Sequence, residues 1–495
     1  MLMDFDSLCR IPERNVDKVP IGYIIFYTKT TTGYLICNDV EIDDDIKSEI
    51  LVFLNALNVS TKSGTTYLYT FKRSDLFYFC ALGCLGSDVS DSVSIEDIRK
   101  TTIRSLNLLK DNNVTNIIIG SDFMPKEIAI ALTLGSYKYD ILKTSSDKNN
   151  ICFRIPKAND EFLKGKSIAY YQNFARFLAD TPANLMTPSL FVDYAKKVTE
   201  NLSNVTLEVF DRKFMEEMGM NLLLSVSNGS IEDPKLLYLR YKGKNSEDAD
   251  ISFVGKGVTF DSGGISLKPS SKMAEMKADM LGAATVLSTL CLASEFKLKL
   301  NVTVTIPLTE NLPSGTATKP GDVKVGMSGK SVEIDNTDAE GRLILADAIT
   351  YTLRRETNVK YLVDVATLTG AMRVALGNVY SGLFCNSDEF ATLITSAGEE
   401  TDDLVWRMPL STKYRSACDS YVADIKNIGA PGSGGSCTAA IFLKEFVDKE
   451  IMWAHIDIAS TMCDSYNKEL YGKGMSGKPV MMLHRLCEKI SENDK

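Results

Sequence analysis

Acidic and basic side chains gather in two stretches of this sequence that lie far apart along the chain. Their charged members are Lys256, Asp261, Lys268, Asp279, Asp338, Glu340 and Arg342. Four carboxylates, in a chain with hardly any histidine, match the oxygen-rich donor set that two divalent cations require. Each carboxylate taken alone would be a helix cap or half of a surface ion pair. The residues by themselves are therefore consistent with two interpretations: a metal centre, or a set of carboxylates with only structural roles.

The first stretch has a backbone that suits close approach to a ligand. The apolar pattern of a buried strand ends at Lys256, and Gly263 and Gly264 follow Asp261. Charged residues just after a strand, beside flexible glycines, can come near a bound group.

The second stretch places two carboxylates on one side of the chain. Asp338 and Glu340 are two residues apart, so they share a side if the backbone there is an extended turn. Gly341 permits such a turn before a helix that begins near Leu343.

Several other chemistries are disfavoured. The chain has only two histidines, His455 and His484, which excludes most zinc-hydrolase and Ser-His-Asp schemes. His455 lies in an apolar strand, Trp453–Ile458, and is expected to be a core residue. The run Gly329–Ser331 resembles the end of a phosphate-binding loop, but Lys324 stands where that motif needs a glycine.

The composition of the chain limits which partners and which cellular compartment are expected. The 495 residues are 44% hydrophobic and carry a net charge of −9, so neither nucleic acid nor a membrane surface is an expected partner. The longest apolar runs are far shorter than the roughly 20 residues of a membrane span, and no signal peptide is recognisable. Eleven scattered cysteines indicate reduced thiols. We therefore expect a cytoplasmic protein.

Short apolar runs alternate with amphipathic segments, which predicts an α/β fold. We expect a smaller N-terminal α/β domain over residues 1–156, used for packing or assembly, and a connector helix over 157–180. A larger catalytic α/β domain over 181–495 would have a mixed, largely parallel central sheet flanked by helices. In such sheets ligands bind beyond the carboxyl ends of the strands, so chemistry is expected in the loops that follow strands, as the first charged stretch does.

Both charged stretches resemble the signatures of the leucine aminopeptidase family of dinuclear metallopeptidases. The match covers Gly255–Lys268 and the whole octapeptide Asn336–Leu343. The likeness extends over Asp180–Pro188, Asp364–Ala371, Gly434–Phe446 and Trp453–Ala459, and no such motif occurs in the first 150 residues.

The resemblance implies a role for each charged residue. Asp261 and Glu340 would contact both metals, Asp338 would complete one site, and Lys256 with Asp279 would complete the other. Lys256 must be neutral as a ligand, which burial and an adjacent dication can enforce. Lys268 would stay charged and stabilise the oxyanion, and Arg342 would hold a bicarbonate ion that acts as general base. Zinc is the usual metal, with manganese, magnesium or cobalt tolerated.

The resemblance also implies a pocket for the first side chain of a peptide. Its residues would be Met276, Thr367, Gly370, Ala459 and Met462. Such a lining suits leucine and similar apolar residues. Met276 and Asp279 would share one face of a helix over Met273–Cys291, although Met276 could instead be plain core. Ser460 and Leu281 depart from the family pattern and leave the side-chain preference open.

The expected protein is therefore a cytoplasmic metal-dependent aminopeptidase that acts on peptides with a free N-terminus, assembled, as the resemblance implies, as a homohexamer of two trimers. A non-enzymatic scaffold would have lost at least one of the charged residues. A two-metal phosphoesterase would show more histidine and an Asp-rich phosphate site.

Overall fold

The computed structural model describes residues 2–10, 20–37, 42–87, 93–120, 122–144, 151–156 and 158–493. The chain forms two compact units. The smaller contains Met3–Asn173 and Asn467–Lys473, and the larger contains Met1–Leu2, Phe174–Tyr466 and Gly474–Lys495.

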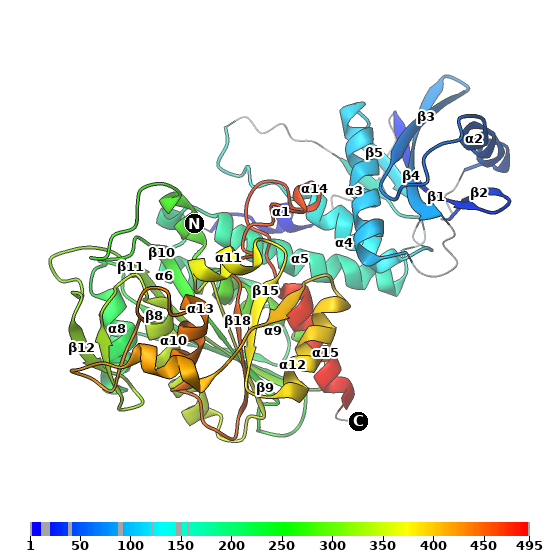
Figure 1. Cartoon of the computed structure of the whole chain (residues 1–495). Coiled ribbons are helices and arrows are strands. Elements are labelled where there is room, and N and C mark those ends of the chain that lie inside the picture. The colour runs from blue at the N-terminus through cyan, green and yellow to red at the C-terminus, as the bar shows by residue number, and fades with distance from the viewer. Residues whose placement is uncertain are drawn as a thin grey trace. The chain divides into compact units, whose positions relative to one another are not determined.

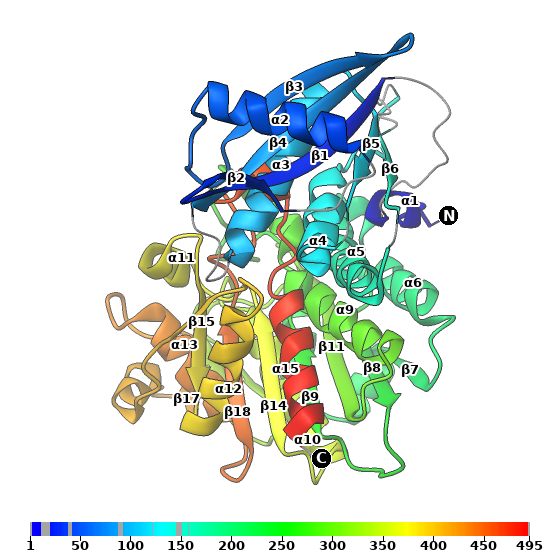
Figure 2. The ribbon, with the colours of Figure 1, turned by 90° about the vertical axis from the view of Figure 1, so that its right-hand side faces the viewer.

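The smaller unit is a mixed sheet between helices (Figures 1 and 2). Its strands are β1 (Ile21–Thr30), β2 (Gly33–Ile36), β3 (Thr66–Arg73), β4 (Leu76–Ser87), β5 (Asn116–Ile119) and β6 (Cys152–Arg154). Its helices are α1 (Asp6–Cys9), α2 (Asp44–Ala56), α3 (Ile95–Asp111), α4 (Pro125–Ser136) and α14 (Lys468–Tyr471), with α5 (Asp160–Asp180) continuing into the larger unit. The strand order is β3-β4-β1-β5-β6, with β2 beside β1.

Local sequence explains how this unit forms. Ser94 caps α3, because its hydroxyl accepts a hydrogen bond from the Asp97 N–H at 3.0 Å. Gly83 allows α3 to approach β4, since a Cβ there would lie 2.5 Å from the Thr101 side chain. On the other face, α2 packs Ile46, Ile50 and Leu54 against the sheet.

The larger unit has a long mixed sheet and a small one. The long sheet contains β7 (Val205–Phe210), β8 (Lys235–Lys242), β9 (Ile251–Gly255), β10 (Gly257–Asp261), β11 (Asn301–Asn311), β14 (Tyr361–Ala366), β15 (Ser381–Cys385), β16 (Val405–Arg407) and β18 (Met452–Asp457). Its order is β16-β15-β18-β14-β9-β11-β8-β7, with β10 beside β11. The small sheet has β12 (Asp322–Val325), β13 (Ser331–Ile334) and β17 (Ile425–Lys426).

Helices cover both faces of the long sheet. They are α6 (Pro188–Thr199), α7 (Arg212–Glu217), α8 (Asn221–Ser227), α9 (Leu281–Glu295), α10 (Gly341–Arg355), α11 (Gly370–Leu376), α12 (Asp388–Glu399), α13 (Gly435–Lys444) and α15 (Val480–Asn493). Figure 2 looks onto the face covered by α9, α12 and α15, while α8, α10 and α13 lie behind it. The central strands β18, β14, β9 and β11 run parallel and are buried on both faces, as their continuous apolar runs predict.

One segment was predicted wrongly. The helix expected over Met273–Cys291 is broken: a 3-10 helix spans Met273–Ala278, and α9 begins only at Leu281. Asp279 lies in the break, where Lys256 and Thr367 bind its carboxylate. Within the described residues, Met273–Glu295 is also the one stretch long and apolar enough to cross a membrane, but 89% of its most apolar window is buried inside the fold. That burial is what the core helix of a sheet protein shows.

Candidate metal centre

Four segments of the larger unit converge beyond the carboxyl ends of its central strands. Lys256 follows β9, and Asp261 ends β10. Asp279 follows the 3-10 helix Met273–Ala278. Asp338 and Glu340 lie in the turn between β13 and α10. The structure thus brings all five predicted metal-binding side chains to the edge at which α/β sheets bind ligands.

These five side chains and Lys268 form what we call the cluster. In one half of it, Lys256 pairs with two carboxylates. Its Nζ lies 2.8 Å from both carboxylate oxygens of Asp279 and 2.8 Å from Glu340 Oε1. It also donates to the Thr367 carbonyl oxygen at 3.0 Å. The absence of a side chain at Gly341 makes room for it, because a Cβ there would lie 2.6 Å from Lys256 Cε.

In the other half of the cluster, Lys268 pairs with the remaining two carboxylates. Its Nζ lies 2.7 Å from Asp261 Oδ2 and 2.5 Å from Asp338 Oδ1. The side chains of Lys268 and Asp338 are 21% and 32% exposed, whereas that of Asp261 is 3% exposed. The cluster therefore opens to solvent on the side of Lys268 and Asp338.

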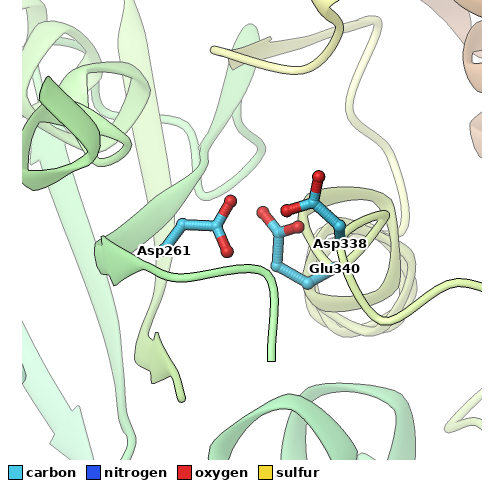
Figure 3. A group of neighbouring side chains, drawn as sticks. All are labelled: Asp261, Asp338 and Glu340. Carbon is cyan, nitrogen blue, oxygen red and sulfur yellow. The ribbon is translucent and has the colours of Figure 1, made fainter. Parts of the chain in front are cut away.

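The carboxylates fit a divalent cation. Asp261, Asp338 and Glu340 point toward one another, and each offers an oxygen within 4.8 Å of the others (Figure 3). In the described part of the chain, Asp279 Oδ2 and Glu340 Oε1 each lie 2.8 Å from Lys256 Nζ, and Asp338 Oδ1 lies 2.5 Å from Lys268 Nζ. Buried carboxylate oxygens need positive partners, which these two ammonium groups supply here, and oxygen donors with one amine also suit hard or borderline dications.

The pKa values of the cluster reflect its four carboxylates and two lysines, which lie close together in a buried site. Burial, together with the charge of Glu340, raises the pKa of Asp261 to about 6. Burial alone would raise the pKa of Glu340, but Lys256 and Lys268 hold it below its ordinary value. Burial alone would lower the pKa of Lys256, but Asp279 and Glu340 raise it. In these surroundings Lys256 is therefore an ammonium group.

Neighbouring polar groups orient these carboxylates, and one of them, Asn311, was not predicted from the sequence. Asn311 Nδ2 donates to Asp261 Oδ1 at 2.8 Å, and the Gly263 N–H donates to the same oxygen at 2.9 Å. Thr367 Oγ1 donates to Asp279 Oδ1 at 2.6 Å. Such partners fix the direction of ligand oxygens. The available signal was a polar asparagine at the end of the apolar strand β11.

Arg342 lies in the first turn of α10 and is 6% exposed. Its Nη1 donates to the Asn427 carbonyl oxygen at 2.7 Å, and its Nε has no partner among the described residues. Burial lowers the pKa of this guanidinium. It retains a buried donor that suits an anion.

The predicted pocket residues lie on three segments. Thr367 contacts the cluster, whereas Met276, Gly370, Ala459 and Met462 make no hydrogen bond to its carboxylates within the described residues. Met276 lies in the 3-10 helix and Asp279 directly follows that helix, so the continuous helix expected to carry both was wrong, whereas a spacing of three residues still suits one side of a 3-10 turn.

A buried carboxylate ties two of these segments together. Asp457 Oδ1 accepts hydrogen bonds from the Leu368 and Ala459 N–H groups, each at 3.1 Å. Of the two departures from the family pattern, Ser460 is buried and donates to the Tyr380 carbonyl oxygen, and Leu281 is buried at the start of α9.

His455 is a core residue, as predicted. It is fully buried, and its Nδ1 lies 2.6 Å from Asp364 Oδ1. Trp453 Nε1 donates to the other oxygen of Asp364 at 2.8 Å. These contacts hold β14 and β18 together.

The fold and the cluster define the class: an α/β protein whose buried carboxylates, at the carboxyl edge of parallel strands, suit a divalent-metal centre. Residues 173–484 match the family described as "Cytosol aminopeptidase family, catalytic domain". The cytosol aminopeptidase of Encephalitozoon cuniculi is 48% identical over 490 residues, which are 99% of each chain. The human cytosol aminopeptidase is 41% identical over 404 residues, 81% of this chain and 77% of the human one.

A solved structure shares the fold. The bottromycin maturation enzyme BotP is 28% identical, with a TM-score of 0.79 over 95% of this chain and 99% of its own. A second structure of BotP is described as a complex with Mn. The chain belongs to the cytosol aminopeptidase family and is a metal-dependent exopeptidase. The fold class, the family and the enzyme class predicted from the sequence are confirmed.

Proposed function

We propose that the chain releases N-terminal leucine and similar apolar residues from peptides, with two divalent cations per subunit and bicarbonate as general base. The observation that supports the proposal is the buried cluster, in which four carboxylates surround two lysine ammonium groups. Zinc is the proposed metal, and manganese, magnesium and cobalt would substitute.

Five side chains would hold the cations. Asp261 and Glu340 would contact both, Asp338 would serve one, and Asp279 with Lys256 would serve the other. When bound, such cations supply a water acidified for attack and polarise the scissile carbonyl. Lys256 would bind only after it loses its proton, which the ion pairs with Asp279 and Glu340 otherwise retain.

Lys268 and Arg342 would perform the remaining chemistry. Lys268 is held by Asp261 and Asp338 on the solvent-accessible side, where its charge would stabilise the oxyanion of the tetrahedral intermediate. Arg342 would hold the bicarbonate, and its unpaired Nε supports that role.

The site would require a free N-terminus, because a cation that binds the substrate amine can do so only at the end of a peptide. Met276, Thr367, Gly370, Ala459 and Met462 would line the pocket for the first side chain. The Asp457 hydrogen bonds, which join the segments of Leu368 and Ala459, support a pocket with fixed walls.

The proposal extends to assembly and compartment. We propose a homohexamer of two trimers that works in the cytoplasm, since the matched relatives are named cytosol aminopeptidases. The proposed domains are an N-terminal domain over residues 1–156, a connector over 157–180 and a catalytic domain over 181–495.

Hydrolysis of leucine amide by the full chain tests the proposal. Activity should disappear with a chelator and return with zinc or manganese. N-acetyl-leucine amide should not be cleaved, because its amine is blocked. Equal rates on the blocked and the free substrate would contradict the requirement for a free N-terminus.

A further inference from the structure

Asn427 makes an unusual set of contacts next to the cluster. It follows β17 and is fully buried. Its Nδ2 donates to the carbonyl oxygens of Asn336 at 2.6 Å and Ala339 at 3.2 Å. Its Oδ1 accepts from the N–H groups of Asp335 at 3.0 Å and Asn336 at 3.2 Å. A single amide thus spans the whole turn from 335 to 339 with four hydrogen bonds.

The backbone of Asn427 adds two further links. Its N–H donates to the Glu333 carbonyl oxygen at 2.9 Å, where β13 ends. Its carbonyl oxygen accepts from Arg342 Nη1 at 2.7 Å. Asn427 therefore joins the strand before the turn, the turn itself and the first turn of α10.

The turn that Asn427 spans carries Asp338 and leads directly to Glu340. Its opposite side is held by Thr337, whose Oγ1 donates to the Gly263 carbonyl oxygen at 2.7 Å and whose carbonyl oxygen accepts from Asn311 Nδ2 at 3.0 Å. Those contacts tie the turn to the segment of Asp261. Asn427 is the anchor on the remaining side, and none of its hydrogen bonds goes to a carboxylate of the cluster.

We propose that Asn427 is a positioning residue: it holds the backbone of the 335–339 turn so that Asp338 and Glu340 present their oxygens to the metals, and it places Arg342 beside them. This inference rests on the proposed function, because it takes Asp338 and Glu340 as metal ligands. Partners that orient metal ligands typically contribute about 10- to 100-fold in metal affinity or activity.

The chain offers a matched control in Asn301, which is also fully buried and also spans a turn with its amide. Its Oδ1 accepts from the Gly243 and Lys244 N–H groups, and its Nδ2 donates to Ser246 and Asp248. Asn301 begins β11, whereas the cluster lies beyond the other end of that strand, at Asn311. A purely structural asparagine should behave like Asn301.

The experiment compares full-length Asn427→Ala, Asn301→Ala and Asp338→Ala with the unchanged chain. Mn²⁺ binding is measured by titration, the Mn²⁺ concentration for half-maximal hydrolysis of leucine amide is determined, and the melting temperature is recorded. We expect both asparagine variants to melt at a lower temperature. Only in Asn427→Ala should the Mn²⁺ concentration for half-maximal activity rise, by about 10-fold or more. The kcat of this variant should return toward normal at saturating Mn²⁺.

The Asp338→Ala variant tests the proposed metal ligands, and the two asparagine variants test the role of Asn427. If Asp338→Ala binds Mn²⁺ like the unchanged chain, the ligand assignment is wrong and the inference falls with it. If Asp338→Ala loses Mn²⁺ while Asn427→Ala binds it normally, or Asn301→Ala weakens binding as much, Asn427 is merely structural. Should an alanine variant fail to fold, Asn427→Ser and Asn301→Ser give the same comparison with a smaller loss of packing.

Discussion

Gly341 is the position at which one added methyl group tests the geometry of the cluster. A Cβ at this residue would lie 2.6 Å from Lys256 Cε and 2.8 Å from its Nζ. Lys256 would have to retreat by about 0.8 Å to reach an ordinary contact distance near 3.4 Å. Metal-ligand distances tolerate only about 0.2 Å, and the carboxylates of Asp279 and Glu340 hold the lysine in place.

Gly341→Ala should therefore damage metal binding more than folding. The added methyl group costs about 1–3 kcal/mol through overpacking, and the helix preference of alanine offsets little of it because Gly341 is only the first residue of α10. We expect a change of at most about 3 kcal/mol in the free energy of unfolding, together with a loss of about 10-fold or more in Mn²⁺ affinity. Metal titration and urea unfolding of the full chain measure the two quantities. The control is Gly315→Ala, where a Cβ meets nothing within 4 Å. A Gly341→Ala protein with normal metal affinity would refute the assignment of Lys256.

Two further perturbations test other parts of the structure. Lys268→Ala should keep its metal, yet its kcat should fall by about 10²- to 10³-fold, because one charged donor to the oxyanion is lost; normal turnover in this variant would show that Lys268 has another role. Glu400 is bound by Arg485 and Lys489; burial alone would raise its pKa, but these partners lower it from 4.5 to about 2. Because the folded pKa is depressed, this stabilisation is present above pH 4.5 and is lost as the pH falls through about 2. Glu400→Gln, whose native side chain is 42% exposed, should cost no more than about 1 kcal/mol at pH 7, and urea unfolding from pH 7 to pH 2 should show the difference from the unchanged chain shrinking toward zero. A difference that stayed constant over this range would contradict the role of the two cations.

Much of the fold could be predicted because the signals are local. The alternation of short apolar runs with amphipathic segments predicted the α/β fold, and the apolar runs of β9, β11 and β14 are examples of it. The pairing of Asp338 with Glu340 was also local, since two residues in an extended turn share a side. The helix over Met273–Cys291 failed because the contacts of Asp279 with Lys256 and Thr367 outweigh its helical pattern.

The orienting asparagines could not be predicted, for a physical reason. Asn311 and Asn427 act through backbone atoms of the turn near Thr337, which lie 26 and more than 80 residues away along the chain. Such contacts exist only after the strands have been placed beside one another. The position of Asn311 at the end of β11 indicates a polar role, but it does not show which backbone atoms the side chain will bind.

The central claim is that carboxylates from two distant stretches hold a pair of cations. Anomalous diffraction from crystals of the full chain grown with Mn²⁺ tests it most directly. We predict two manganese peaks per subunit, one contacted by Asp338 and the other by Lys256 and Asp279, with Asp261 and Glu340 in contact with both. An anomalous map with no peak among these side chains at saturating Mn²⁺ would contradict the account.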